Sequence, residues 1–358
     1  MELRVYLGKL EAEGLWVLSQ PNFATLVAQG VKNNSIFDLA DPQNRDDSHQ
    51  PYYMLRQRFN AHGVEFYTSD AVSQEVPLFE LHMNVQTPGI SKFQYLLLLE
   101  TPQIYSDNAD AARWTAYRKV FTWNDQLVNG DRFIKINFPN VIRLEKSASY
   151  AQRSRFCCMI SGNRAATTSD DRTLYGARVE AIRWFEANAP QEFELFGVDW
   201  DIPAARAGMV GKIQRRLWLQ VKQVVNVKHF PSYRGKIARK CDVLGTTRFA
   251  ICFENVRDLN GYITEKIFDC FFAGCVPVYW GAANISDYIP RDCFIDRRSF
   301  HDTADVYQFL VGMSETAFNQ YQKSILEFLQ SKAVYPFSSE CFVETIVNTI
   351  MQDVAPQS

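Results

Sequence analysis

The stretch of sequence that decides the fold spans residues 248–281 and reads RFAICFENVRDLNGYITEKIFDCFFAGCVPVYWG. Two apolar runs of strand length, at 249–253 and 276–279, flank a segment with helical character. Thr264 is a residue type that caps helix N-termini, and Gly274 is the type that commonly follows the end of a helix. The stretch therefore predicts a strand, a loop, a helix and a second strand.

The same alternation of strand and helix continues on both sides of this stretch. The expected strands lie at residues 3–7, 64–67, 93–99, 120–122, 133–137, 156–160, 193–196 and 293–295. The expected helices lie at 52–61, 172–188 and 236–244, followed by two tail helices that Ser314 and either Ser338 or Ser339 can cap. Alternation of this kind implies an α/β fold with parallel sheets covered by helices on both faces.

The length of the chain, 358 residues, fits two domains of moderate size. A polar and charged stretch at residues 143–155 separates the two series of elements, so we place a boundary there. We expect an N-terminal domain over 1–150, a C-terminal domain over 151–335, and a last helix at 336–358 that packs back on the first domain. Two such domains in tandem form a cleft, and parallel sheets bind ligands at the carboxyl ends of their strands.

Composition narrows the class of protein. Hydrophobic residues make up 47% of the chain and charged residues 22%, and the net charge of −2 gives no reason to expect a nucleic-acid partner. No run approaches the about 18 apolar residues of a membrane-spanning helix, and the N-terminus has no basic-then-apolar signal region, so we expect a cytoplasmic protein. The eight cysteines include no CxxC pair, which favours buried free thiols over a zinc site or disulfides.

The start of the helix after Thr264 has the chemistry of an anion site. A helix N-terminus offers free N–H groups and the positive end of a dipole, and Lys266 adds a cation. Glu265 would repel a phosphate placed directly there, so it suits the hydroxyls of a ribose or sugar better. From spacing alone, a solvated Glu-Lys pair at the start of a helix remains an equal alternative.

Three segments in this stretch resemble a known signature. Phe-Glu-Asn at 253–255, Gly-Tyr-Ile-Thr-Glu-Lys at 261–266 and Ala-Gly-Cys-Val-Pro-Val-Tyr-Trp-Gly at 273–281 closely resemble the motif of the α-1,3-fucosyltransferases, glycosyltransferase family 10. The resemblance implies a GT-B architecture, in which two Rossmann-like domains face a cleft. It also implies a GDP-fucose donor, whose expected contacts are Arg178, Asn255, Tyr262, Glu265 and Lys266.

The family resemblance also implies an inverting reaction that needs a general base on the facing domain. Glu100 is the candidate, because it ends a buried strand and its Glu-Thr-Pro context resembles the Glu-Ser-Pro segment of the family. The alternative is a carboxylate that only marks the exit of a strand. Arg178 and Lys266 could stabilise the leaving diphosphate without a metal, so no cofactor is expected, and any stimulation by a divalent ion would be indirect. The pair Asp199 and Asp201 forms a D-x-D pattern that lies outside the donor motif.

Other readings remain open at this point. The fold could use another nucleotide sugar, or the chain could be a catalytically silent sugar-binding protein. The expected acceptor is a glycan, such as a bacterial surface glycan or a lipopolysaccharide intermediate. Residues 212–228 carry five basic and no acidic side chains among many apolar ones. They suit either peripheral contact with the inner face of a membrane or a helix packed on the donor domain. Trp123-Asn-Asp125 follows an expected strand, and no role can be assigned to it.

Overall fold

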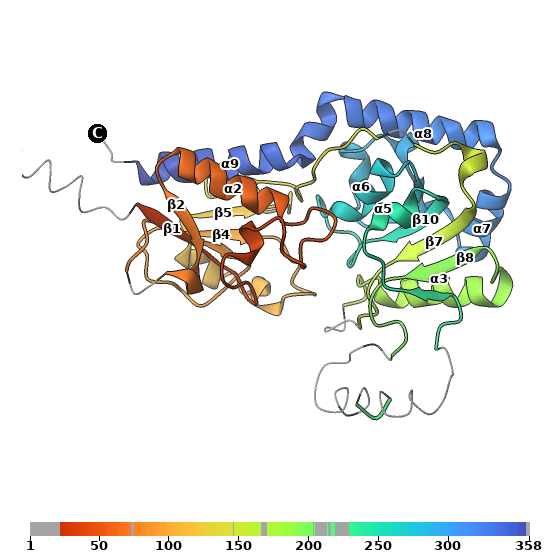
Figure 1. Cartoon of the computed structure of the whole chain (residues 1–358), viewed down its shortest axis with the longest axis horizontal. Helices are drawn as coiled ribbons and strands as arrows, with labels where there is room; N and C mark the ends of the chain where they lie inside the picture. The colour runs from red at the N-terminus through yellow and green to blue at the C-terminus, as the bar shows by residue number, and fades with distance from the viewer. Residues whose placement is uncertain are drawn as a thin grey trace, which may run out of the picture.

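The chain forms two α/β domains that lie side by side (Figure 1). The structure is a computed structural model that describes residues 22–72, 75–145, 147–165, 170–202 and 229–355, together with 204, 213 and 216–218. The strand expected at 3–7 lies outside the described residues, as does most of the basic segment 212–228. Among the described residues, no helix combines the length and the apolar character needed to cross a bilayer.

The first domain is built on six parallel strands in the order β2-β1-β3-β4-β5-β6. They are β1 (Phe23–Val27), β2 (Glu65–Thr68), β3 (Glu80–Met83), β4 (Gln94–Leu98), β5 (Lys119–Thr122) and β6 (Phe133–Lys135). Helices α2 (Gln50–Ala61) and α9 (Ser339–Val354) share one core with this sheet. The opposite face of the sheet carries a smaller core around Leu96 and Val120, which 3-10 turns and loops cover in the described part of the chain. Helices were expected on both faces of this sheet, but among the described residues they cover one face only.

The second domain also has six parallel strands, in the order β12-β11-β10-β7-β8-β9. They are β7 (Arg155–Ile160), β8 (Phe193–Phe196), β9 (Tyr233–Gly235), β10 (Thr247–Phe253), β11 (Val276–Trp280) and β12 (Ile295–Asp296). One core contains α3 (Tyr175–Asn188) and α7 (Thr303–Val311), and the other contains α5 (Lys240–Leu244) and α6 (Glu265–Phe272). Helix α8 (Glu315–Gln330) supplies Phe318 to the first of these cores and Phe328 to the second.

This architecture confirms the α/β fold with two Rossmann-like domains and C-terminal helices. The sequence pattern missed β1, β3, β9 and α7, and it overextended α5. Strand β3 was not predicted because Glu80 and His82 are polar, and polar residues are normally expected at the surface. In the structure these two residues are only 5% and 0% exposed. The short strand expected at 293–295 was wrong in part, since Cys293 lies in a 3-10 turn before β12. All eight cysteines are free and six of them are buried.

The C-terminal helix returns to the first domain, as the view in Figure 1 shows. The amide of Asn140 donates to the carbonyl of Phe337 at 2.8 Å, and the amide of Ser339 donates to the carbonyl of Asn140 at 2.9 Å. Ser338 caps α9, and the apolar face of that helix, which includes Phe342 and Ile346, is buried in the first core. The last helix of the chain thus joins the two domains a second time.

Arg153 anchors the connection between the domains to the second domain. Its side chain is 1% exposed, and its guanidinium donates to the carbonyls of Leu244 at 3.0 Å, Thr247 at 2.7 Å and Ala273 at 2.8 Å. These carbonyls lie at the end of α5, in β10 and at the end of α6. One buried cation therefore satisfies three elements at once.

We expect Arg153→Met to lower the free energy of unfolding by roughly 3 kcal/mol or more, because buried acceptors that lose a charged donor cost about 1–3 kcal/mol each. Urea denaturation followed by circular dichroism measures the change. Arg58→Met is the control, since that side chain is half exposed and 3.7 Å from Glu344, and its loss should cost within about 0.5 kcal/mol. Equal losses in the two variants would contradict the anchoring role.

Candidate active site

The carboxyl edge of the second sheet opens into a cavity of about 690 Å³, which we call the edge cavity. Ser161 and Gly162 follow β7 and line one side, and Gly197 lines it after β8. Arg178 of α3 and Lys266 of α6 line it as well. The cavity therefore lies at the strand ends where parallel sheets bind ligands.

A second cavity of about 440 Å³ lies between the domains, and we call it the interdomain cavity. Tyr52 of α2, Glu100 after β4 and Phe138 line it from the first domain, and Phe272 of α6 lines it from the second. The residues that line both cavities are Arg45, Asp46, Ser48, Lys240 and Glu265. The two cavities therefore adjoin, and one ligand pair can extend from the second sheet to Glu100.

A fully buried carboxylate, that of Glu254, organises the start of α6. It accepts hydrogen bonds from the Thr264 amide at 2.9 Å, the Thr264 hydroxyl at 2.8 Å and the Lys266 amine at 3.1 Å. Burial pulls the pKa of Lys266 down, but the Glu254 and Glu265 carboxylates outweigh it and leave the pKa above its ordinary value. Lys266 is thus a charged lysine held by the buried Glu254, and its amine also lies 3.8 Å from the half-exposed carboxylate of Glu265.

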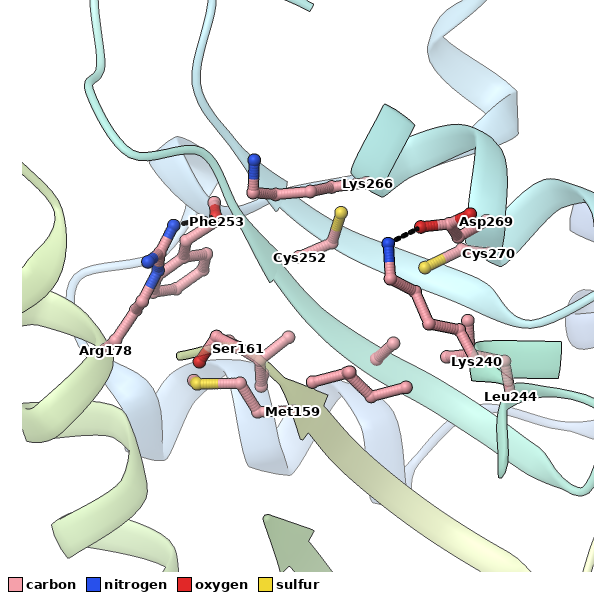
Figure 2. A pocket seen from close by; sticks show the side chains of 13 residues that line it. Met159, Ser161, Arg178, Lys240, Leu244, Cys252, Phe253, Lys266, Asp269 and Cys270 are labelled. Atoms are coloured by element: carbon pink, nitrogen blue, oxygen red, sulfur yellow. Dashed lines mark hydrogen bonds and ion pairs between the residues drawn. The ribbon is translucent and has the colours of Figure 1, made fainter. Parts of the chain in front are cut away.

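Arg178 lies at the end of β10, close to Lys266. It is 4% exposed, and its guanidinium donates to the Phe253 carbonyl at 2.7 Å and to the Asn255 side-chain oxygen at 3.0 Å. Figure 2 shows Arg178 and Lys266 beside this strand end, with the bond from Arg178 to Phe253 dashed. Asn255 also lines the edge cavity. Three of the sequence-predicted donor contacts thus meet at one place.

Glu265 lies where the two cavities join. Burial raises its pKa, but Lys266, Lys240, its own backbone amide and the Thr264 side chain outweigh burial and lower the pKa to about 2. Lys240 donates to Asp269 at 2.6 Å, as Figure 2 shows, and Asp269 lies one helical turn after Glu265 in α6. Burial raises the pKa of Asp269 to about 6, against the pull of Lys240. Sequence reasoning missed Lys240 and Asp269, although the i, i+4 spacing of Glu265 and Asp269 was a usable signal.

Glu100 lies two residues after the end of β4 and lines the interdomain cavity. Its amide donates to Asn84 at 2.9 Å and its carbonyl accepts from Asn108 at 2.8 Å, so its backbone is fixed. Within the described part of the chain, no protein group donates a hydrogen bond to its carboxylate. Burial raises its pKa above the ordinary value, and Lys266 opposes that shift. Such a carboxylate is available to accept a proton from a bound hydroxyl.

Tyr262 is the exception among the predicted site residues. It is 1% exposed and lines neither cavity, because its ring packs against the first domain. Its centroid lies 4.8 Å from that of Trp123 and 5.8 Å from that of Phe138. The structure therefore places Tyr262 at an interdomain contact, and the expected donor contact of this residue stays a prediction.

The D-x-D pattern is split by the fold. Asp199 lines the edge cavity, whereas Asp201 is absent from its lining. Among the described residues, the one cluster with ligand atoms close enough for a metal ion is His301, Asp302 and Asp305, which is exposed and lines neither cavity.

The second domain matches a known family. Residues 196–335 match the family model described as glycosyltransferase family 10 (fucosyltransferase), C-terminal part. The chain is 29% identical over 103 residues to the alpha-(1,3)-fucosyltransferase FucT of Helicobacter pylori, and this matching region covers 28% of this chain and 21% of that protein. It is 38% identical over 69 residues to 4-galactosyl-N-acetylglucosaminide 3-alpha-L-fucosyltransferase 9 of Mus musculus, which covers 19% of each. The chain thus spans about a fifth of the length of these relatives. The resemblance to family 10 noted in the sequence is confirmed for this domain.

Solved structures extend the likeness to both domains at the level of the fold. A crystal structure of an alpha1,3-fucosyltransferase with GDP-fucose superposes with a TM-score of 0.52 at 13% identity, covering 95% of this chain and 92% of that one. A sucrose-phosphate synthase from Thermosynechococcus elongatus superposes with a TM-score of 0.55 at 12% identity, covering 94% and 100%. The two-domain GT-B architecture is therefore shared.

We expect Glu254→Gln to destabilise the protein by about 2 kcal/mol and to weaken binding of GDP. The carboxylate of Glu254 accepts three hydrogen bonds, whereas the glutamine amide would place its own N–H donors against some of these donors. Thermal melting and calorimetric titration with GDP measure the two effects. Asp302→Asn is the matched control, since this exposed cap of α7 can be replaced by asparagine at little cost. Unchanged GDP affinity in Glu254→Gln would show that Glu254 does not hold Lys266 in place for an anion.

Proposed function

We propose that this protein, whose second domain is a glycosyltransferase family 10 domain, transfers L-fucose from GDP-fucose to a hydroxyl of a glycan acceptor with inversion at the anomeric carbon. One observation carries the proposal. Two adjoining cavities meet at the ionised Glu265, with Arg178 and Lys266 in one and, in the other, the carboxylate of Glu100, to which no described residue donates a hydrogen bond. This arrangement suits a leaving diphosphate on one side and an attacking hydroxyl on the other.

The edge cavity is the proposed donor site, with residues 151–335 as the donor domain. Its volume accommodates a nucleotide, and the N-terminus of α6 with Arg178 and Lys266 offers positive charge for the diphosphate. These groups would stabilise the charge that develops as GDP leaves. Asn255 would complete the nucleotide contacts, and Glu265 would accept hydrogen bonds from hydroxyls of the sugar.

The interdomain cavity is the proposed acceptor site, with residues 1–150 as the acceptor domain. Tyr52 and Phe138 offer flat apolar surfaces for a sugar ring. The acceptor hydroxyl would attack the anomeric carbon on the face opposite GDP and form the new C–O bond as the bond to the diphosphate breaks. Its proton would pass to Glu100.

Two alternatives follow from particular observations. Structures with the same fold include an alpha-glucosyltransferase in complex with UDP-glucose, at a TM-score of 0.52, so the architecture alone does not select the sugar. A catalytically silent sugar-binding protein would not need an unpaired carboxylate with a raised pKa beside the site.

A bacterial surface glycan or lipopolysaccharide as acceptor, and peripheral membrane contact through residues 212–228, are proposals that rest on the sequence.

A donor screen tests the proposed function directly. We expect release of GDP from GDP-fucose to depend on added acceptor glycan. Release of GDP from GDP-mannose, or of UDP from UDP-glucose, should be at least about tenfold slower, because a site that pairs with substrate hydroxyls discriminates strongly between sugars. Release measured with a coupled assay over an acceptor panel gives the rates. Equal rates with a UDP-sugar would favour the alternative donor.

Glu100→Gln is the inactive control for the same assay. This variant should bind GDP with wild-type affinity and lose transfer by a factor of about 10² or more, because an amide cannot accept the proton. Near-normal turnover of Glu100→Gln would leave Glu100 as a carboxylate at a strand exit and nothing more.

The pH profile follows from the raised pKa of Glu100. A general base must be ionised, so kcat/KM should rise with pH through a pKa above the about 4.3 of an ordinary glutamate and then level off. Glu265, with its pKa lowered to about 2, stays ionised over this range. Initial rates between about pH 4 and pH 8 would give the profile.

Asp269 is the group that could produce the same limb, because its pKa is raised to about 6. Asp269→Asn should retain the acid limb if Glu100 is the base. Disappearance of the limb in Asp269→Asn would assign the titration to Asp269 instead, and an acid limb at or below the ordinary glutamate pKa would contradict burial of the base.

A further inference from the structure

Trp123, for which sequence analysis assigned no role, lies between the two halves of the candidate site. It is 3% exposed, and its indole N–H donates to the carbonyl of Leu99, the residue before Glu100, at 2.6 Å. Its ring packs at 4.8 Å on Tyr262, which lies three residues before Glu265. The side chain of Trp123 therefore contacts both the segment after β4 that carries Glu100 and the loop that leads into α6.

A polar cluster around Asp125 fixes the same interface. Asp125 belongs to the first domain and accepts hydrogen bonds from Lys135 at 2.6 Å within that domain. From the second domain, the Tyr288 hydroxyl donates to it at 2.6 Å and the Asn284 amide donates at 2.9 Å. Burial raises the pKa of Asp125, but these donors outweigh it and keep the carboxyl ionised with a lowered pKa. Asp125 is thus an ionised carboxylate that accepts hydrogen bonds from side chains of both domains.

Gly261 brings the backbone of the second domain directly against the first. It has a φ of +82°, and its amide donates to Asn284 at 2.9 Å. A Cβ atom at Gly261 would lie 2.3 Å from the Trp123 carbonyl and 2.9 Å from Asp125. Because no side chain fits in this space, the two domains can approach this closely at this point with glycine alone.

We propose that Trp123 and Gly261 form a rigid pivot between the domains, which holds Glu100 at a fixed position opposite the start of α6, so that Trp123 is a positioning residue. The inference rests on the proposed function for its consequence. The base and the leaving group come from different domains, and a misplacement of about 1 Å between reacting groups can cost 10²-fold in rate. A pivot next to Glu100 and the start of α6 limits that error, because a small rotation of one domain against the other moves the atoms nearest the pivot least.

A pair of glycine variants separates the pivot from ordinary backbone strain. Gly130 has a φ of +75° in the first domain with no atom within 4 Å of a built Cβ, whereas Gly261 has a similar φ and a blocked Cβ. Gly261→Ala should lower kcat by at least about tenfold relative to Gly130→Ala, with the GDP dissociation constant within about twofold of wild type. Equal kcat in the two variants would overturn the proposal, as would a loss of GDP affinity as large as the loss of kcat.

A pair of tryptophan variants tests the same point with a milder change, and it decides the matter if Gly261→Ala does not fold. Trp123→Phe removes the N–H that bonds to Leu99, and Trp114→Phe removes an indole N–H that has no hydrogen-bond partner among the described residues. Trp123→Phe should lower kcat severalfold with unchanged KM for the donor, and Trp114→Phe should leave kcat unchanged. A wild-type kcat in Trp123→Phe, or a change in donor KM alone, would overturn the positioning role.

Small-angle scattering gives a result that needs no turnover. Gly261→Ala should show a larger radius of gyration than Gly130→Ala, because the domains are pushed apart at the pivot. An unchanged radius with wild-type stability would overturn the pivot. Absence of transfer by the wild-type protein, with the expected change in radius, would instead refute the proposed reaction and leave the pivot standing.

Discussion

The buried carboxylate of Glu254 is the contact on which the arrangement of the site depends. It is the first residue after β10, and it binds the cap residue and the lysine of the next helix. A charge without solvent exposure is stable only when it is paired and hydrogen-bonded, so the loop must return to this point. The start of α6, the charge on Lys266 and the space beside Arg178 all follow from that return. Family resemblance had drawn attention to the residues after it, but the physical centre is the glutamate itself.

The second constraint is the relation between the domains. The last helix packs on the first sheet, Asp125 accepts hydrogen bonds from the second domain, and Gly261 allows close approach of the two backbones. On the cavity side, Asp46 of the first domain accepts from the amide of Lys240 at 2.9 Å. Contacts on both sides of the cavities thus set their width. In the proposed reaction this matters because base and leaving group lie on different domains.

Sequence reasoning found most of the candidate site because its members stand at element ends, where local patterns are strong. Lys266 and Glu265 follow a cap residue, and Glu100 follows a continuous apolar run, so each could be placed before any contact was known. Arg178 was placed by resemblance, and the structure brings it to Asn255. The remaining members could not be found in this way. Lys240 and the loop at 45–48 reach the cavities only through tertiary packing, and nothing in their neighbouring residues distinguishes them from surface charges. Asp269 alone had a local signal, its i, i+4 spacing from Glu265.

By itself, the sequence determined the strand–loop–helix–strand unit at 248–281, its cap at Thr264, the caps of the tail helices and the α/β class. These features depend on local spacing of apolar residues and on which side chains satisfy free amides, and both are written in neighbouring positions. Only the tertiary structure decided that polar strand β3 lies in the interior, that Glu254 is buried and that Tyr262 faces the other domain. Those outcomes depend on burial and on partners distant in sequence, which no local pattern encodes.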